Sequence, residues 1–392
     1  MARNELTDLY ASVTLLLKIR VGETFYLQFL REALHRCKIF CFLLLFLLTA
    51  SCGQASTQVQ KDQAIPVLPT PVPTLRSLAQ AHGMYIGTTV SVGALQDEKQ
   101  YRDILATEFN MVTPEVSMKF DATEPERGHY NFTEGDTLVA FATAHNMQVR
   151  GHNLVWYMAL PSWLTTGHFT RDELLSILHD HIFAEVTHYR EQVNIWDVVN
   201  EAINNDGTLR DSIWSRGIGP DYLDLAFRWA HEANPQARLF YNDYGGEGLG
   251  QKSNAIYNLV SGMIKRGVPI NGVGLQMHVS VDGYPPPQDV LANMKRLAAL
   301  GLEVQITEMD VRIQNDPRPM QVRLAAEAQI YGEMLSTCLA VEQCTAFVMW
   351  GFTDRHSWIP GATGHPDAPL IFDTAYRPKP AFFALMNALS QK

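Results

Sequence analysis

The chain has 392 residues, of which 46% are hydrophobic, so it is long enough to bury a sizeable core in one large or two ordinary domains. Its 31 basic and 41 acidic residues give a formal net charge of −10, which argues against the basic footprint of a nucleic-acid-binding protein. This balance favours a neutral or uncharged polymer as the binding partner.

Residues 1–53 contain a targeting signal. An apolar run at 39–48 follows Lys38 and is too short to span a bilayer comfortably. The run leads through small residues to Cys52, as in a bacterial lipobox, although Thr49 stands where Leu is usual. We expect an exported bacterial protein, either anchored to the membrane at the cell surface by a lipid on Cys52 or secreted without one. The long segment before Lys38 leaves the true start codon open.

Residues 54–75 are rich in proline and carry too little apolar surface to form a core, so they predict an extended linker. The folded part is then 76–392. Cysteines Cys338 and Cys344 lie close together in this part, which makes a disulfide the favoured prediction and two unlinked buried thiols the alternative. There is no Cys-x-x-Cys pair and no zinc-type histidine spacing, so we expect no metal site.

Short apolar runs alternate with amphipathic runs through the folded part, as in a parallel sheet with crossover helices. The predicted strands are 84–90, 110–115, 148–156, 194–201, 238–244, 272–278, 303–310 and 346–352. Helices are predicted at 97–108, 171–189, 221–233, 251–266, 288–300 and 319–339. Eight such units predict an α/β fold, a single (β/α)8 TIM barrel. A doubly wound sheet is the alternative, but no glycine-rich phosphate loop follows the first strand.

Polar or aromatic side chains stand at the ends of the predicted strands, where a barrel of this kind places its functional groups. They are Glu115, Lys119, His152, Trp156, Asn200, Glu201, Asn242, Asp243, Gln276, His278, Glu308, Asp310 and Trp350. Any one of them could be a cap or a satisfied core residue. Together they predict a site at one face of the barrel.

Two acids stand out because each ends an apolar run, where an unpaired carboxylate is costly. Glu201 ends strand four and Glu308 ends strand seven, so the two carboxylates can face each other across the barrel mouth. At about 5 to 5.5 Å such a pair hydrolyses a glycosidic bond with retention, and at a wider separation with inversion.

The motifs around these acids resemble those of the glycoside hydrolase family 10 xylanases over about 78–389. They include Gly151-His152-Asn153-Leu154-Val155-Trp156, Trp196-Asp197-Val198-Val199-Asn200-Glu201, Gly274-Leu275-Gln276-Met277-His278 and Ile306-Thr307-Glu308-Met309-Asp310. Further matches are Thr113-Pro114-Glu115, Met118-Lys119, Tyr241-Asn242-Asp243-Tyr244, Trp350-Gly351-Phe352-Thr353-Asp354, Ser357-Trp358 and 376–380. The Cys338 and Cys344 pair also resembles one found in many members.

The resemblance implies a role for each of these residues. Glu201 is implied to be the acid/base and Glu308 the nucleophile, kept anionic by His278, which Asp310 orients from behind. Asn200 is implied to donate to the sugar 2-hydroxyl, a contact that strengthens in the transition state. The implied substrate-binding residues are Glu115, Lys119, His152, Trp156, Asn200, Gln276, His278, Trp350 and Trp358.

The chain departs from the family pattern at the predicted outer subsite. Val116 stands where the family usually has Asn, and Tyr157, Met158 and Ala159 replace a usual His-Ser-Gln. The missing amides normally contact the sugar one unit beyond the cleaved residue on the non-reducing side. We therefore expect this subsite to bind ordinary xylose weakly or to accept another group.

The predicted function is that of a retaining endo-1,4-β-xylanase, acting without a cofactor as a monomer on xylan or a related β-1,4-glycan. One alternative is a β-glycosidase for decorated or short xylosides, aryl glycosides or another β-1,4-glycan. A different alternative is a surface protein that binds polysaccharide on an inactive barrel. The presence of both Glu201 and Glu308 argues against this last hypothesis.

Overall fold

The computed structural model describes residues 72–391. The predicted signal segment, the lipidation candidate Cys52 and most of the predicted linker lie outside these residues.

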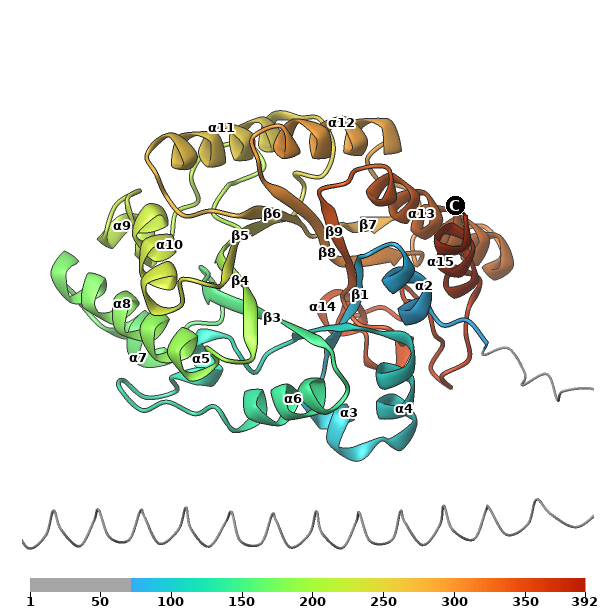
Figure 1. The fold of residues 1–392 in the computed structure, drawn as a ribbon, viewed down its shortest axis with the longest axis horizontal. Helices are drawn as coiled ribbons and strands as arrows, with labels where there is room; N and C mark the ends of the chain where they lie inside the picture. Colours follow the sequence, from blue (N-terminus) through green and yellow to red (C-terminus); the bar gives the residue numbers. More distant parts are fainter. Residues whose placement is uncertain (1–71, 392) are drawn as a thin grey trace, which may run out of the picture. The chain divides into compact units, whose positions relative to one another are not determined.

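Eight parallel strands form a closed barrel that is surrounded by helices (Figure 1). The barrel strands are β1 (Tyr85–Val90), β2 (Met111–Pro114), β3 (Gln148–Val155), β4 (Val193–Asn200), β5 (Arg238–Asp243), β6 (Gly272–Leu275), β8 (Glu303–Arg312) and β9 (Cys344–Met349). Each pairs with the next in parallel, and the pairings of β6 with β8 and of β9 with β1 close the ring. The predicted single (β/α)8 barrel is confirmed.

The larger helices outside the barrel follow the strands in chain order, as right-handed crossovers require. They are α4 (Lys99–Glu108), α6 (Thr133–Ala144), α8 (Arg171–His188), α10 (Tyr222–Ala233), α11 (Gln251–Lys265), α12 (Pro287–Ala298), α13 (Met320–Leu339) and α15 (Pro380–Ser390). Shorter segments are α2 (Leu75–Ala81), α3 (Val92–Asp97), α5 (Phe120–Thr123), α7 (Ser162–Thr166), α9 (Ile213–Gly217), η1 (Asp354–His356) and α14 (Ile359–Thr363). The predicted helix ranges had not included α2, α6 or α15, nor most of these shorter segments.

The local sequence explains where helices begin and why the strands are almost continuous runs of apolar residues. Thr170 and Glu173 form a capping box at the start of α8, in which each side chain accepts a hydrogen bond from the other residue's backbone N–H. Strands such as β4 are covered on both faces and read as almost continuous apolar sequence. Inside the barrel, apolar side chains from alternate positions pack as a cluster separate from the main core: Met111, Ile195, Phe240, Ala346 and Val348.

The sixth predicted strand, 272–278, is not continuous. It divides into β6 and a short strand β7 (His278–Ser280), which pairs with the far end of β8. Met277 lies between them in the left-handed region, with φ 68°, a conformation that a strand cannot contain. This break turns His278 out of the barrel sheet toward Asp310, its register partner on β8.

The last residues of the predicted linker are part of the structure of α2. Thr74 caps α2, and the buried Leu75 begins it. The backbone N–H of Leu75 donates to Glu108 at the end of α4, 2.9 Å away, so this residue belongs to the folded domain.

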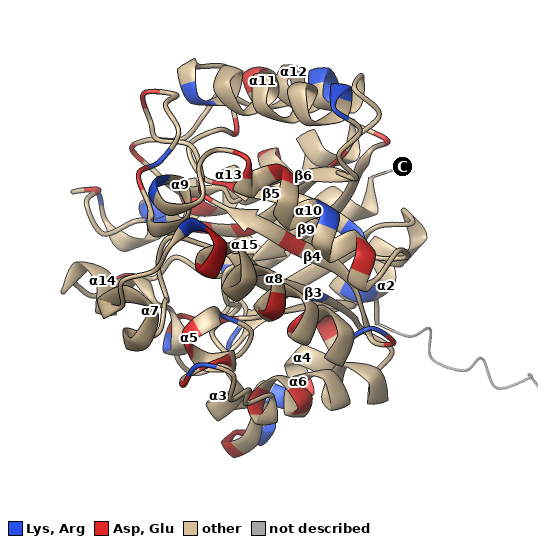
Figure 2. Cartoon of the chain, turned by 90° about the vertical axis from the view of Figure 1, so that its left-hand side faces the viewer, with Lys and Arg blue, Asp and Glu red and all other residues tan. Residues whose placement is uncertain are grey.

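Charged residues cover the outside of the barrel in both signs. On the side drawn in Figure 2, Lys and Arg lie among Asp and Glu over the outer helices. Within residues 72–391, each helix is too short or too polar to cross a membrane. A disulfide links Cys338, at the end of α13, to Cys344, at the start of β9.

A buried lysine holds the C-terminal part of the chain against the barrel. The ammonium of Lys379 lies 2.9 Å from Glu327 on α13 and 3.1 Å from Asp354 in η1, and it donates to the carbonyl of Ala368. Because all three charged side chains are buried, removing the cation leaves two carboxylates without their counter-ion.

Lys379→Met should therefore lower the free energy of unfolding by about 3 to 5 kcal/mol, because breaking a buried ion pair leaves an uncompensated charge. Denaturant titration measures the change. Lys295→Met, at an exposed position on α12, is the control and should change the value by less than about 0.5 kcal/mol. Equal stabilities for the two variants would contradict this view of Lys379.

Candidate active site

A pocket of about 460 Å³ opens at the carboxyl ends of the strands. Its lining contains all the residues predicted to be catalytic or to bind substrate: Glu115, Lys119, His152, Trp156, Asn200, Glu201, Gln276, His278, Glu308, Trp350 and Trp358. Asp310 lies behind the lining. The residues predicted from the strand ends thus lie in one pocket, because all strands of a parallel barrel end at the same face.

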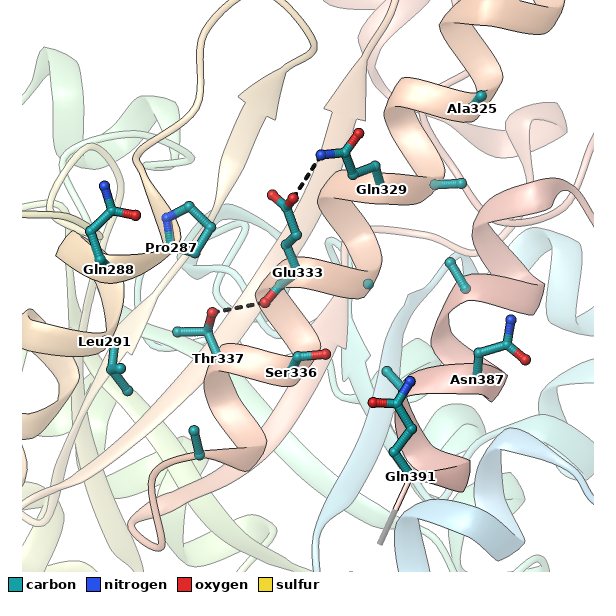
Figure 3. Close-up of a pocket in the computed structure, with 15 residues that line it drawn as sticks. Pro287, Gln288, Leu291, Ala325, Gln329, Glu333, Ser336, Thr337, Asn387 and Gln391 are labelled. Atoms are coloured by element: carbon teal, nitrogen blue, oxygen red, sulfur yellow. Dashed lines mark hydrogen bonds between the residues drawn. The ribbon is translucent and has the colours of Figure 1, made fainter.

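A larger open groove of about 780 Å³ lies on the outside of the barrel over α12, α13 and α15 (Figure 3). It is lined by aliphatic, hydroxyl and amide side chains and by a single carboxylate, Glu333, which accepts a hydrogen bond from Gln329 at 2.7 Å. One carboxylate cannot provide the two roles that glycoside hydrolysis needs. The pocket at the barrel mouth is therefore the candidate active site.

Glu308, at the end of the apolar part of β8, is buried and hydrogen-bonded on both oxygens. Asn242 Nδ2 donates to Oε1 at 2.6 Å, and His278 Nε2 lies 3.2 Å from Oε2. Burial alone would raise the pKa of Glu308, but the hydrogen bond from His278 and the charges of His152 and His278 outweigh it and hold this pKa below its ordinary value. Glu308 is consequently ionised at neutral pH.

His278 lies between two carboxylates. Its Nδ1 is 2.8 Å from Asp310 Oδ2, on the opposite side from Glu308. Burial alone would lower the pKa of His278, but the charge and hydrogen bond of Asp310, together with those of Glu308, raise it well above its ordinary value. Trp358 Nε1 donates to the same Asp310 oxygen at 2.9 Å, so one carboxylate orients both the histidine and a pocket wall.

Glu201 follows β4 at the opposite side of the ring. Its side chain accepts hydrogen bonds from Gln276 Nε2 at 3.0 Å and from Asn200 Nδ2 at 3.3 Å, both to Oε1. Its backbone is left-handed, with φ 57°, a conformation that costs free energy in a residue with a Cβ. Arg210 Nε, which donates to the carbonyl of Glu201 at 2.7 Å, holds this turn in place.

Asn242 connects the two acids. Its Nδ2 donates to Asn200 Oδ1 at 2.9 Å as well as to Glu308, and Asn200 in turn donates to Glu201. A Cβ on Gly274 would lie 2.1 Å from Asn242 Oδ1, so this position of β6 must be glycine for the amide to fit. The amide network therefore fixes both carboxylates before any substrate binds.

His152 is oriented from inside the barrel. Its Nδ1 lies 3.0 Å from Asp197 Oδ2, and the buried Arg150 binds both Asp197 and Gln305. Burial alone would raise the pKa of Asp197, but the charge of Arg150 and the bonds from His152 and Arg150 lower it. This ionised carboxylate fixes the imidazole, whose Nδ1 is 4.0 Å from Glu308 Oε1.

Tryptophans form the walls of the pocket around a lysine. The ammonium of Lys119 lies 5.0 Å from the ring centre of Trp156 and 5.8 Å from that of Trp350. Burial raises the pKa of the neighbouring Glu115, an effect that the charge of Lys119 opposes. Indole rings and a cation with free N–H groups suit the faces and hydroxyls of a sugar.

Several residues of the site were missing from the predicted set of site residues. Asn242 had been noted only as a strand-end residue, although the same signal could have assigned it a role. Tyr157 directly follows one predicted strand and Tyr244 is the last residue of another, and both line the pocket. Arg312 was missed because β8 continues two residues beyond its predicted end at Asp310.

Among residues 72–391, no three His, Cys, Asp or Glu side chains lie close enough together to hold a metal ion. The reactive groups of the pocket are two carboxylates on opposite strands, with amides, imidazoles and indoles around them. On a (β/α)8 barrel this constellation defines a glycoside hydrolase.

Comparison with known proteins names the family. Residues 74–388 match glycosyl hydrolase family 10, and the chain belongs to this family. It is 42% identical over 322 residues to endo-1,4-β-xylanase B of Thermotoga neapolitana, an alignment that covers 81% of this chain and 92% of the relative.

Two solved structures have the same fold. Native xylanase 10B from Thermotoga maritima is 42% identical with a TM-score of 0.79, over 81% of this chain and 98% of that one. Xylanase 10B from Thermotoga petrophila, in complex with xylobiose, has the same identity and TM-score over 82% and 98%.

Removing the positive charge next to Glu308 should move the pH profile. His278→Asn should raise the pKa of Glu308, because it removes a hydrogen bond and a charge that lower this pKa, and the acid limb of kcat/KM should therefore shift to higher pH. Initial rates across pH measure the limb. His231→Asn, at an exposed position on α10, is the control, and an unmoved limb in His278→Asn would refute the assignment.

Proposed function

We propose that this protein is a retaining endo-1,4-β-xylanase that cleaves internal bonds of xylan, with Glu201 as acid/base and Glu308 as nucleophile. The observation that carries the proposal is the pair of buried carboxylates in one pocket, each held by a different set of hydrogen bonds. Family 10 is a retaining family, and several of the relatives that this chain matches are endo-1,4-β-xylanases.

In the first step, a carboxylate oxygen of Glu308 bonds to the anomeric carbon as the glycosidic C–O bond breaks. Glu201 gives its proton to the leaving oxygen, so that the departing chain leaves as an alcohol. In the second step, Glu201 takes a proton from water, the water oxygen bonds to the anomeric carbon, and Glu308 is released as a carboxylate. The two inversions give net retention.

The surrounding residues support these steps through binding and orientation. Asn200, next to Glu201, is placed to donate to the 2-hydroxyl of the reacting sugar, and His152 and Lys119 to its other hydroxyls. Gln276 contacts the neighbouring position, and the indoles of Trp156, Trp350 and Trp358 pack on pyranose faces. Because the amides and imidazoles are already hydrogen-bonded in place, little reorganisation is needed in the transition state.

The full-length chain, incubated with xylan, a β-1,4-glucan and a mannan, tests the substrate. Short xylo-oligomers released from xylan alone, measured as new reducing ends and by product size, are expected. Activity on aryl glycosides or β-glucan with little on xylan would favour the alternative β-glycosidase. A lack of activity on all substrates would favour the inactive binding protein.

Replacing either acid should abolish turnover on xylan, since Glu201→Gln removes the transferable proton and Glu308→Gln the nucleophile. Each should lower kcat by at least about 10²-fold. An aryl xyloside with a good leaving group separates the roles, because its bond breaks without protonation: Glu201→Gln should still release the phenol in a burst, and Glu308→Gln should not. Glu333→Gln, in the outer groove of Figure 3, is the matched control and should keep wild-type rates.

We also propose that the protein is exported and tethered to a bacterial membrane through a lipid on Cys52. The apolar run 39–48 and the small residues before Cys52 support this proposal. In a bacterial host fed a labelled fatty acid, the full chain should take up label and sediment with membranes. Cys52→Ser should lose both properties and Cys37→Ser neither. Label retained in Cys52→Ser would refute the tether.

A further inference from the structure

Apolar side chains are exposed at the rim of the active-site pocket. Val116, Met158 and Trp358 are 52%, 50% and 41% exposed, and all three line this pocket. Trp358 already has two roles, because its ring can pack on a sugar and its Nε1 donates a hydrogen bond to Asp310. Val116 and Met158 have no such role. Exposed apolar groups gathered at a binding pocket mark a surface that a ligand covers.

The two loops that carry these side chains are fixed by backbone hydrogen bonds. Lys119 N donates to the carbonyl of Val116 at 2.8 Å, which closes the turn after β2. Asp121 N donates to the carbonyl of Ala159 at 3.0 Å, which ties that turn to the loop after β3. We define the apolar rim as Val116 and Met158. The hydrogen bonds hold it in place without a ligand, and a ligand that binds there displaces the water in contact with it.

A cation with unused donors lies beside the rim in the same pocket. The ammonium of Lys119 contacts the rings of Trp156 and Trp350, and within residues 72–391 it makes neither a side-chain hydrogen bond nor an ion pair. A lysine carries three N–H donors, so it can bind a hydroxyl of the sugar and one further acceptor. Apolar contacts and a nearby donor suit a small group that has both a methyl and a carbonyl oxygen.

We propose that the apolar rim binds an acyl ester on the sugar chain, and that the preferred substrate is O-acetylated xylan. This inference rests on the proposed xylanase function. The acetyl methyl packs against Val116 and Met158, and the ester carbonyl accepts an N–H of Lys119. A free hydroxyl at the same place can also accept this N–H, but it brings no methyl to the apolar rim, and its own O–H loses water without finding an acceptor there, which costs free energy. The apolar rim thus favours a substituted sugar over a plain one.

The test uses one soluble oligomer in two forms: xylotetraose with a single acetyl group, and the same oligomer after alkaline removal of the ester. The full-length enzyme should show a kcat/KM at least about fourfold higher for the acetylated form, the gain expected from burying one methyl. Mass spectrometry should find the acetyl group on the product from the non-reducing side of the cleaved bond.

Variants connect the preference to the rim. Val116→Asn and Met158→Gln together should bring the ratio of the two kcat/KM values to about 1, chiefly by raising the rate on the deacetylated oligomer. Val322→Asn and Met320→Gln on α13, which are 41% and 48% exposed and away from the pocket, should leave the ratio unchanged.

Two negative results have different meanings. The proposed acyl preference is overturned if the wild-type ratio of kcat/KM, acetylated over deacetylated, is 1 or less, or if the rim variants keep the wild-type ratio. Either result leaves the xylanase function unaffected. Failure of the wild-type enzyme to cleave either oligomer overturns the proposed function itself.

Discussion

The active site depends on the compensation of buried negative charge. The interior of the barrel and its mouth contain the carboxylates of Asp197, Glu201, Glu308 and Asp310, all of which are excluded from most of the solvent. A buried carboxylate without partners either costs several kcal/mol or takes up a proton. Each of these groups therefore needs donors, and the donors differ from one carboxylate to the next.

Glu308 receives its stabilisation from two sides. His278, held by Asp310, approaches one oxygen, and Asn242 donates to the other. Within residues 72–391, the carboxylate of Glu201 accepts its hydrogen bonds from amides alone and forms no ion pair. Two acids in one pocket thus have different environments, which is the physical basis for assigning one to nucleophilic attack and the other to proton transfer.

The pocket is polar where the bond is broken and apolar at one edge. Amides and imidazoles surround the two acids, whereas Val116 and Met158 present hydrocarbon at the rim. Binding energy from groups remote from the reacting bond helps to orient and distort the reacting sugar. We propose that an acyl substituent supplies such a remote contact at the apolar rim.

The sequence by itself determined the barrel, because eight apolar runs alternating with amphipathic ones leave a parallel closed sheet as the simple way to bury them. It also located the site, since polar residues at strand ends meet at one face of such a barrel. Only the tertiary structure revealed the break at Met277, the two added residues of β8 that bring Arg312 into the pocket, and the bond from Asn242 to Glu308. These features depend on a left-handed backbone, on strand pairing and on contacts between residues far apart in the chain, and a local sequence pattern contains none of them.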